Sequence, residues 1–141
     1  MHKLAIVYYS GTGNTEIMAN AIAASAKKFG TEVQILTADN FGPDSIDLYD
    51  SIAFGCPSMG VENLEEEVFE PMFSSIESKL KGKPIALFGS YGWGEGQWME
   101  DWEERVKADG AILLYSPIIA QEKPDLVALG KCTLLGEILG K

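Results

Sequence analysis

A short polar segment near the N-terminus, residues 10–15, has the composition of a phosphate-binding loop: Ser-Gly-Thr-Gly-Asn-Thr. It follows the apolar run Leu4–Tyr9 and so marks the junction between an expected strand and an expected helix. Gly11 and Gly13 allow backbone conformations that other residues avoid, and they let a ligand approach the main chain. The amides at a helix start lack partners and carry partial positive charge, which suits an anion. Four side chains add neutral hydrogen-bond donors: Ser10, Thr12, Asn14 and Thr15.

The same segment also fits a simpler interpretation, an ordinary strand-to-helix turn capped by Asn14 or Thr15. Features of phosphate-transferring loops are missing, because the motif GxxxxGK is absent and the segment contains no Lys or Arg. Neutral donors are sufficient to hold a phosphate that does not react. If the segment binds phosphate, its composition indicates an anchor rather than a site of phosphoryl transfer.

Two later loops carry large side chains that are able to form a flat binding slot. Met59 and Gly60 follow the apolar run Ser51–Gly55, and Trp93 lies in a glycine-rich segment, residues 92–96. A tryptophan in such a loop has little regular structure to pack against, although it can also close the end of a core. Methionine alone is a common gap-filler. If the two side chains face each other across a cleft, they form the walls of a slot for a planar ring.

The elements around these loops alternate between strands and helices. Strands are expected at Leu4–Tyr9, Glu32–Thr37, Ser51–Gly55, Pro84–Gly89 and Ala111–Tyr115, the last resuming after Pro117. Helices are expected from Thr15, around Phe69 to Leu80 with Pro71 in the first turn, from Trp98 to Asp109, and from Leu126, where Gly130 and Gly136 count against a helix. This order predicts βαβ units with right-handed crossovers.

These units predict an α/β fold: one domain over residues 1–141, with a doubly wound, five-stranded parallel sheet in the order 2-1-3-4-5 and helices on both faces. In such a sheet ligands bind beyond the carboxyl ends of the strands, near the switch point between strands 1 and 3. The loops after strands 1, 3 and 4 are then expected to converge. A phosphate anchor beside a slot formed by Met59 and Trp93 predicts FMN as the cofactor.

The chain is strongly acidic, with 11 Lys and Arg against 21 Asp and Glu and a net charge of −10, which argues against nucleic-acid binding. The acids gather in two stretches, the first containing Glu62, Glu65, Glu66, Glu67 and Glu70 and the second Glu95, Glu100, Asp101, Glu103 and Glu104. Either stretch alone is explained as a solvated face. Together they predict a shared acidic surface, which would steer a partner with a basic docking surface.

Composition also bounds the compartment. No apolar run is long enough to cross a bilayer, and the N-terminus lacks the cationic start and apolar core of a signal peptide. Cys56 and Cys132 match neither a zinc motif nor a disulfide framework, so two reduced thiols are expected in preference to a bridge. We therefore expect a cytoplasmic monomer without membrane contact or bound metal.

Taken in order, the three loops resemble those of the flavodoxins, in particular the short-chain type of anaerobic bacteria, along essentially the whole chain. The matching segments are residues 9–16 (YSGTGNTE), 55–60 (GCPSMG) and 87–94 (LFGSYGWG), and their order and spacing are highly specific. The resemblance implies a flavodoxin-like fold with FMN bound without a covalent link. It also implies low-potential, one-electron transfer between redox proteins through semiquinone and hydroquinone states.

The resemblance further implies roles for single residues. Trp93 is expected on the outer face of the flavin and Met59 on the inner face, with the phosphate in the loop of residues 10–15. The Gly60 carbonyl is expected to turn toward flavin N5 on reduction, and Glu62 to bond the pyrimidine edge near N3. The loop Gln121–Asp125 is expected near the ring edge. The full implied cofactor-binding set is Ser10, Gly11, Thr12, Gly13, Asn14, Thr15, Ser58, Met59, Gly60, Glu62, Ser90, Tyr91, Gly92, Trp93 and Gly94.

Two other functions are compatible with the same fold. A quinone or flavin reductase is the enzyme alternative, and this chain is short for an added substrate pocket or nicotinamide site. A response-regulator-like module needs acids after the first strand and a phosphoacceptor aspartate after the third, where the sequence has Tyr-Tyr-Ser and Cys-Pro-Ser. An electron carrier with no catalytic residues of its own is the expected function.

Overall fold

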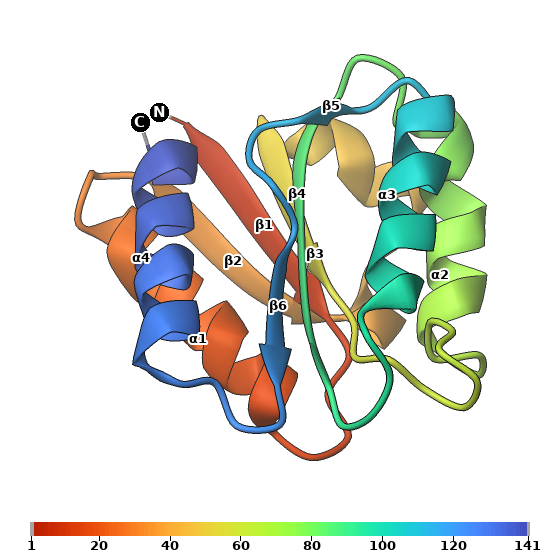
Figure 1. Ribbon diagram of the computed structural model, residues 1–141. Coiled ribbons are helices and arrows are strands. Elements are labelled where there is room, and N and C mark those ends of the chain that lie inside the picture. The colour runs from red at the N-terminus through yellow and green to blue at the C-terminus, as the bar shows by residue number, and fades with distance from the viewer. Residues whose placement is uncertain (1, 141) are drawn as a thin grey trace.

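The computed structural model describes residues 2–140 and is built around a parallel β-sheet (Figure 1). Its strands are β1 (Lys3–Tyr8), β2 (Glu32–Thr37), β3 (Ser51–Gly55), β4 (Pro84–Tyr91), β5 (Ile112–Leu113) and β6 (Ile118–Gln121). They follow the order β2-β1-β3-β4-β5, and β6 also pairs with β4, every pairing being parallel. The predicted doubly wound sheet in the order 2-1-3-4-5 is confirmed.

The fifth position of the sheet differs from the prediction, because two short strands share it. β5 pairs with the start of β4, at Pro84 and Ile85, whereas β6 pairs with the end of β4, from Phe88 to Tyr91. The predicted strand Ala111–Tyr115 is therefore mostly irregular, and the longer strand is the one that resumes after Pro117. Proline has no N–H to donate to a sheet, so a break at this position is expected.

Within residues 2–140, α-helices cover both faces of the sheet (Figure 1). They are α1 (Asn14–Lys27), α2 (Phe69–Ile76), α3 (Gln97–Ala108) and α4 (Leu126–Gly140), accompanied by the 3₁₀ turns Ala38–Asn40, Pro43–Leu48 and Glu77–Lys79. The first and last helices pack on one face, and α2 and α3 pack on the other. The predicted arrangement of helices on both faces is thereby confirmed.

Two details of the helices refine the prediction. Pro71 is the third residue of α2, where its missing N–H removes no helical bond, as expected. The α-helix stops at Ile76, and a 3₁₀ turn continues the chain to buried Leu80. The helix α4 continues through Gly136. A Cβ at this position would lie 2.5 Å from the carbonyl oxygen of Ile22 in α1. The glycine permits α4 to approach α1 closely.

The two cores on either side of the sheet explain the buried aromatic and sulfur side chains. Trp98 and Trp102 are each 1% exposed beneath α3, so both are packing residues, as their helical spacing predicts. Cys56 lies in the core beneath α2 and α3, and Cys132 lies in the core beneath α1 and α4. Both are free thiols, so the expectation of two reduced cysteines is confirmed.

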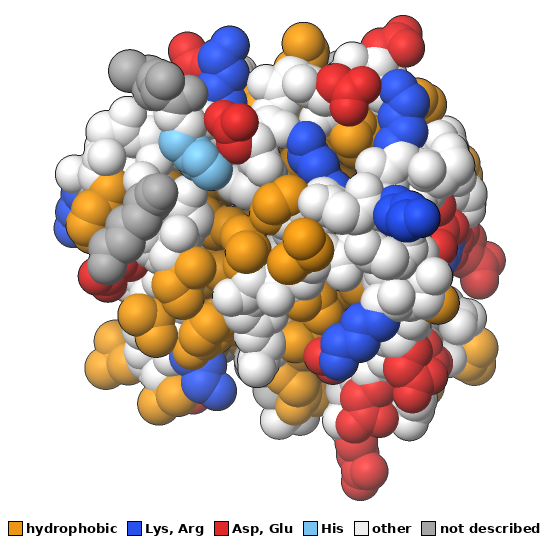
Figure 2. Space-filling model, turned by 90° about the horizontal axis from the view of Figure 1, so that it is seen from above, with side chains coloured by type: hydrophobic (Ala, Val, Ile, Leu, Met, Phe, Trp, Pro, Cys, Tyr) orange, Lys and Arg blue, Asp and Glu red, His pale blue; other side chains and the backbone are white. Residues whose placement is uncertain are grey.

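The carboxyl ends of the strands define one end of the molecule. The loops after β1, β3, β4 and β6 meet there, at the bottom of Figure 1. Figure 2 shows the opposite end, where basic and acidic side chains are interspersed among hydrophobic ones. Within residues 2–140, none of the helices has the combined length and apolar character that crossing a bilayer requires.

Candidate functional site

The loop after β1 is organised by Ser10. Its Oγ accepts hydrogen bonds from the amide of Gly13 at 3.1 Å and from the amide of Glu16 at 3.3 Å. Gly13 is the N-cap of α1 with φ of 95°, in the left-handed region that favours glycine. The alternative of a cap by Asn14 or Thr15 is therefore wrong. A hydroxyl that accepts two N–H bonds still has its own proton, so Ser10 remains a donor.

Thr15 ties this loop to the centre of the sheet. Its hydroxyl shares a 2.9 Å hydrogen bond with the hydroxyl of Ser90 and accepts the amide of Ser90 at 3.3 Å. Thr15 is 1% exposed and Ser90 is 4% exposed, so the contact lies beneath the loop. Ser90 and Tyr91 were expected in a loop, but both belong to β4. The first loop is consequently mounted on the end of a central strand.

The loop after β3 is a tight turn. The backbones of Met59 and Asn63 exchange two hydrogen bonds of 2.8 Å, and the amide of Ser58 donates to the carbonyl of Ser90 at 3.0 Å. Gly60 and Glu62 both have positive φ, 55° and 56° respectively. The base of the turn is thus fixed against β4, while its apex projects from the sheet.

Glu62 connects this turn to the loop after β4. Its Oε1 accepts the amide of Gln97, the first residue of α3, at 2.9 Å. A carboxylate at this point is stabilised by the partial positive charge of the helix start. A Cβ at Gly94 would lie 2.6 Å from the Glu62 carboxyl, so a glycine is needed for the two loops to meet.

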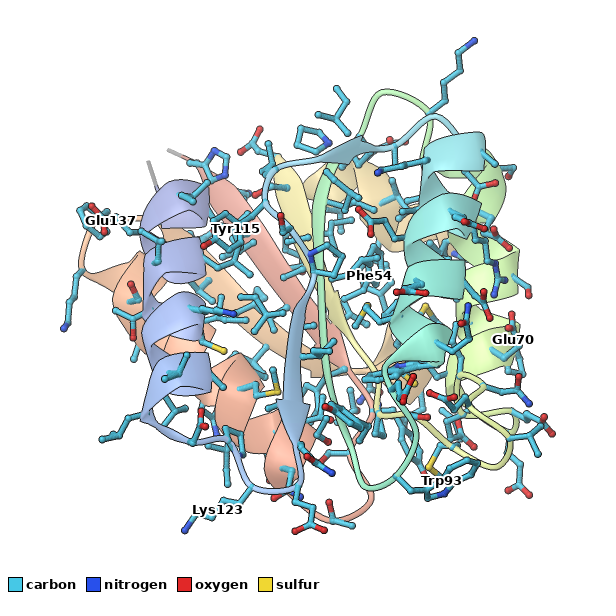
Figure 3. The ribbon with its side chains drawn as sticks, viewed as in Figure 1. Phe54, Glu70, Trp93, Tyr115, Lys123 and Glu137 are labelled. Carbon is cyan, nitrogen blue, oxygen red and sulfur yellow. The ribbon has the colours of Figure 1, made fainter. Side chains whose placement is uncertain are left out.

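Two large apolar side chains project from these loops toward solvent. Trp93 is 63% exposed, and Met59 is 39% exposed. Figure 3 shows Trp93 at the carboxyl end of the sheet, well away from Phe54 in the core. The alternative that Trp93 closes the core is therefore wrong. Exposed apolar side chains of this size suit a ligand with a planar, apolar face.

A cavity of about 190 Å³ joins the loops. It is lined by Gly11, Thr12, Asn14, Pro57, Ser58, Met59, Ser90, Tyr91, Gly92 and Glu122. Met59 also borders a second hollow that is shared with Gly60, Val61 and Tyr9. Of the remaining expected site residues, Ser10, Gly13 and Thr15 lie in or beneath the first loop, and Glu62, Trp93 and Gly94 lie along the rim of the later loops. The predicted convergence of the three loops is confirmed.

Sequence reasoning missed three lining residues, Tyr9, Pro57 and Glu122. Glu122 belongs to the loop after β6. The Glu122 amide donates to the carbonyl of Tyr91 at 2.7 Å, and the φ angle of Glu122 is 56°. Tyr9 and Pro57 lie within the matching segments, residues 9–16 and 55–60, which was the available signal. The sequence showed the position of the loop around Glu122 but gave no sign of its left-handed backbone.

The two acidic stretches meet beside the site. A groove of about 420 Å³ between the turn after β3 and α3 is lined in part by Glu62, Glu66, Glu70 and Asp101, which come from both stretches. A shared acidic surface is thus present. Glu65 does not belong to it, because this side chain is only 5% exposed.

Arg105 partly balances this surface. Its guanidinium binds both oxygens of Glu70 at 2.7 Å and both oxygens of Glu77 at 2.6 and 2.9 Å. Asp109, at the end of α3, faces the same Glu77. Burial, together with the neighbouring Glu77 carboxyl, raises the pKa of Asp109 to about 6. The charges nearest the site are left without this cation, because Arg105 is committed to Glu70 and Glu77.

Comparison with known proteins agrees with this geometry. Residues 6–133 match the family model of the flavodoxins. The chain is 46% identical to the flavodoxin of Megasphaera elsdenii, over 96% of this chain and 97% of that protein. It is also 46% identical to the flavodoxin of Clostridium beijerinckii, over 85% and 87% respectively. The solution structure of two-electron-reduced Megasphaera elsdenii flavodoxin superposes with a TM-score of 0.90 at 44% identity, covering 97% of this chain and 98% of that one.

The fold and the site define an α/β protein that binds a phosphate-bearing planar cofactor at the carboxyl end of its sheet. This chain belongs to the flavodoxin family, and it is an FMN-binding electron carrier.

The chain's own residues fit FMN. The loop after β1 offers neutral donors, including the free proton of Ser10, for a phosphate. Met59 and Trp93 offer exposed apolar surfaces for the ring system. Gly94 and Gly60 occupy positive-φ positions beside those surfaces, where a Cβ would strain the backbone.

Proposed function

We propose that the loop after β1 anchors the FMN phosphate. Its donors are the side chains of Ser10, Thr12 and Asn14 and the amide of Gly11. Gly13 and Thr15 shape the loop instead, because the Gly13 amide bonds Ser10 and the buried Thr15 hydroxyl bonds Ser90. Support comes from the hydrogen bonds that Ser10 accepts from the amides of Gly13 and Glu16, which fix the loop and leave the Ser10 proton to donate. Because the donors are neutral, they retain the phosphate without activating it.

In the same proposal, Met59 and Trp93 orient the flavin between them, with Ser58, Tyr91 and Gly92 along its edges. Gly60 presents its carbonyl to the proton on flavin N5, and Glu62 accepts a hydrogen bond from N3. This assignment rests on the exposure of Trp93 and Met59. Both are large apolar side chains that the protein leaves unburied, and a bound flavin ring would cover them. Ser90 supports the site from beneath through Thr15.

Bound FMN supplies electron transfer in one-electron steps, and the protein sets the free energy of each step. When a group gains a negative charge about 4 Å from a carboxylate, the repulsion raises the free energy of the charged form by about 4 kcal/mol at an effective dielectric of 20. Glu122 lines the cavity and Glu62 lies on the adjoining turn, and no cation lines the cavity among the residues that the structure describes. These residues therefore lower the potential for adding the second electron.

We further propose that the protein acts on no substrate of its own and exchanges electrons with partner proteins in the cytoplasm. The acidic groove beside the site favours partners with basic docking surfaces. The two buried free thiols suit a reducing compartment.

Two measurements on the purified protein test these proposals. Stepwise anaerobic reduction of the FMN-loaded chain, followed by visible absorption, is expected to resolve two separate one-electron couples. A chain that rejects added FMN contradicts the site assignment. Steady NAD(P)H–quinone turnover by the protein alone contradicts the carrier and supports a reductase.

A further inference from the structure

The turn that carries Gly60 is held on its exit side by one buried carboxylate. Glu65 is 5% exposed, and its amide donates to Cys56 Sγ at 3.4 Å, at the carboxyl end of β3. The residue thus lies between the core of the sheet and the turn formed by Met59–Asn63. Its backbone is bonded to Cys56 at the end of β3, and only Leu64 separates it from Asn63, the last residue of the turn.

The Glu65 side chain binds the start of α2. Its Oε1 accepts the amides of Val68 at 2.8 Å and Phe69 at 2.7 Å, and its Oε2 accepts the amide of Glu67 at 2.8 Å. These are the amides that a helix start leaves without helical partners. The residue at the N-cap, Val68, makes no side-chain cap, so Glu65 performs this function from three residues upstream.

The charge on Glu65 is stabilised although the side chain is buried. Burial acts to raise the pKa of its carboxyl, but the amides of Phe69, Val68 and Glu67 together outweigh burial and keep the pKa below its usual value. The carboxylate therefore stays ionised and bonded at neutral pH. It links the segment that follows the turn to the start of α2. Phe69 continues this link into the aromatic core, where its ring meets that of Trp102 edge to face with 5.4 Å between the ring centroids.

We infer that Glu65 is a positioning residue that holds the Met59–Asn63 turn, and hence the Gly60 carbonyl, in register with the flavin pocket. This inference rests on the proposed role of Gly60. The entry side of the turn is held by the bond from Ser58 to Ser90, and the exit side by Glu65, so movement is confined to the apex. Because both ends of the turn are fixed, the free energy of rotating the Gly60 peptide depends on that peptide and not on movement of the whole turn.

Glu65→Gln tests this assignment, and Glu70→Gln is the matched control. An amide NH₂ in the place of Oε2 faces the Glu67 N–H, so two donors oppose each other and the clamp loosens. Glu70 lies in the first turn of α2 (Figure 3), five residues after Glu65, and its replacement removes the same charge. Its side chain binds Arg105 and Ser74 rather than the turn.

Three quantities are compared between the full-length variants: the FMN dissociation constant, the midpoint potential of the first one-electron couple, and the hydrogen exchange of the Asn63 amide in FMN-free protein. Glu65→Gln is expected to reduce the equilibrium constant of the first couple about tenfold, or about 59 mV. It is expected to change FMN affinity less than threefold and to speed Asn63 exchange at least tenfold. Glu70→Gln is expected to leave all three within twofold.

Glu65→Asp keeps the charge but shortens the reach, so an intermediate loss is expected. Equal potential shifts in Glu65→Gln and Glu70→Gln would overturn the inference, because charge alone then explains them. Unchanged Asn63 exchange would also overturn it, because Glu65 then serves α2 alone. If Glu65→Gln does not fold, Glu65→Asp is tested in its place, by its potential shift relative to that of Glu70→Gln and by the exchange of its Asn63 amide. Failure of the Gly60 role is recognised separately, by an unchanged first couple in Gly60→Ala with an intact Glu65.

Discussion

The loop after β1 is shaped by contacts that span three and six residues, from Ser10 to Gly13 and to Glu16. The turn after β3 depends on contacts that span nine and 35 residues, from Glu65 to Cys56 and from Glu62 to Gln97. Above its anchor on β4, where Thr15 bonds Ser90, the first loop is therefore shaped by its own residues. The second receives its geometry from β3, α2 and α3.

This difference corresponds to the two tasks of the site. A phosphate that never reacts needs a static set of donors, which local bonds supply. A peptide that responds to the charge of the flavin needs freedom at its apex and a fixed base, which distant partners supply. We therefore expect substitutions in the first loop to change FMN affinity and substitutions in the turn to change redox potential.

Ser10→Ala is expected to have the largest effect, on affinity. It removes the acceptor of two loop amides and one donor to the phosphate. Hydrogen bonds to charged groups contribute about 1.5–3 kcal/mol, which corresponds to about a 10- to 100-fold weaker affinity. Titration by flavin fluorescence measures the loss. If the shift in redox potential, expressed as a free energy, were as large as the loss of binding free energy, the proposed division of roles between the two loops would be contradicted.

Trp93→Ala is expected to weaken FMN binding about tenfold, because aromatic stacking contributes about 0.5–1.5 kcal/mol beyond burial. The FMN-free protein is expected to keep its stability, since Trp93 is 63% exposed. Trp98→Phe is the matched control. Trp98 is buried, and its indole N–H donates to the Cys56 carbonyl at 3.1 Å. Urea unfolding of the FMN-free protein should therefore show lower stability for Trp98→Phe and unchanged stability for Trp93→Ala.

Gly60→Ala is expected to lower the potential of the first couple by tens of millivolts and to change FMN affinity less. A Cβ meets no atom within 4 Å here, so the effect arises from the backbone, where positive φ costs a side chain about 1–2 kcal/mol. Gly30→Ala is the control, because its Cβ also meets no atom within 4 Å and its φ is also positive, at 79°, but Gly30 does not line the cavity. Spectroelectrochemical titration separates the two quantities. Equal losses in affinity and potential would contradict a redox-linked role for Gly60.

Asp109→Asn is expected to have the smallest effect, and on neither loop. The pKa of Asp109 is raised to about 6 by burial and by Glu77, whereas an unfolded aspartate titrates near 4. Between about pH 4 and pH 6 the native state holds a proton that the unfolded chain has lost, so stability falls as pH rises through this window. Asparagine removes that loss.

We expect the Asp109→Asn variant to exceed the wild type in unfolding free energy by about 1 kcal/mol at pH 7.5. The gain should disappear below about pH 4, where the aspartate becomes protonated in the unfolded chain as well as in the native state. Urea unfolding at the two pH values measures it. FMN affinity and both potentials should stay unchanged, because α3 ends at the far end of the sheet from the site (Figure 1).

Much of the fold could be predicted because hydrophobic patterning is a local property. Buried strands such as Leu4–Tyr8 are continuously apolar, and α3 repeats its tryptophans at helical spacing. The fifth position of the sheet was predicted less well. Both Ala111–Tyr115 and the residues after Pro117 are apolar, and the choice between them depends on which segment reaches β4.

The candidate site divides in the same way. Gly13 and the polar residues around it were identified from their types and spacing. Glu65 was read as one member of an acidic cluster, although its carboxylate is buried at the start of α2. Nothing in the pattern of charges distinguishes Glu65 from Glu66, which lines the acidic groove. Their roles separate only when α2 is placed against the end of β3.

The sequence by itself determined the strand and helix order and the composition of the loop at Ser10–Thr15, because these depend on contacts between near neighbours. The tertiary structure decided which carboxylates are partners of the chain and which face solvent. The Glu62 carboxylate accepts an amide at the start of α3, 35 residues along the chain, and Glu65 is buried next to the end of β3. The donors to Glu65 are near neighbours in the sequence, but the burial of Glu65 and the partner of Glu62 depend on elements that only folding brings together.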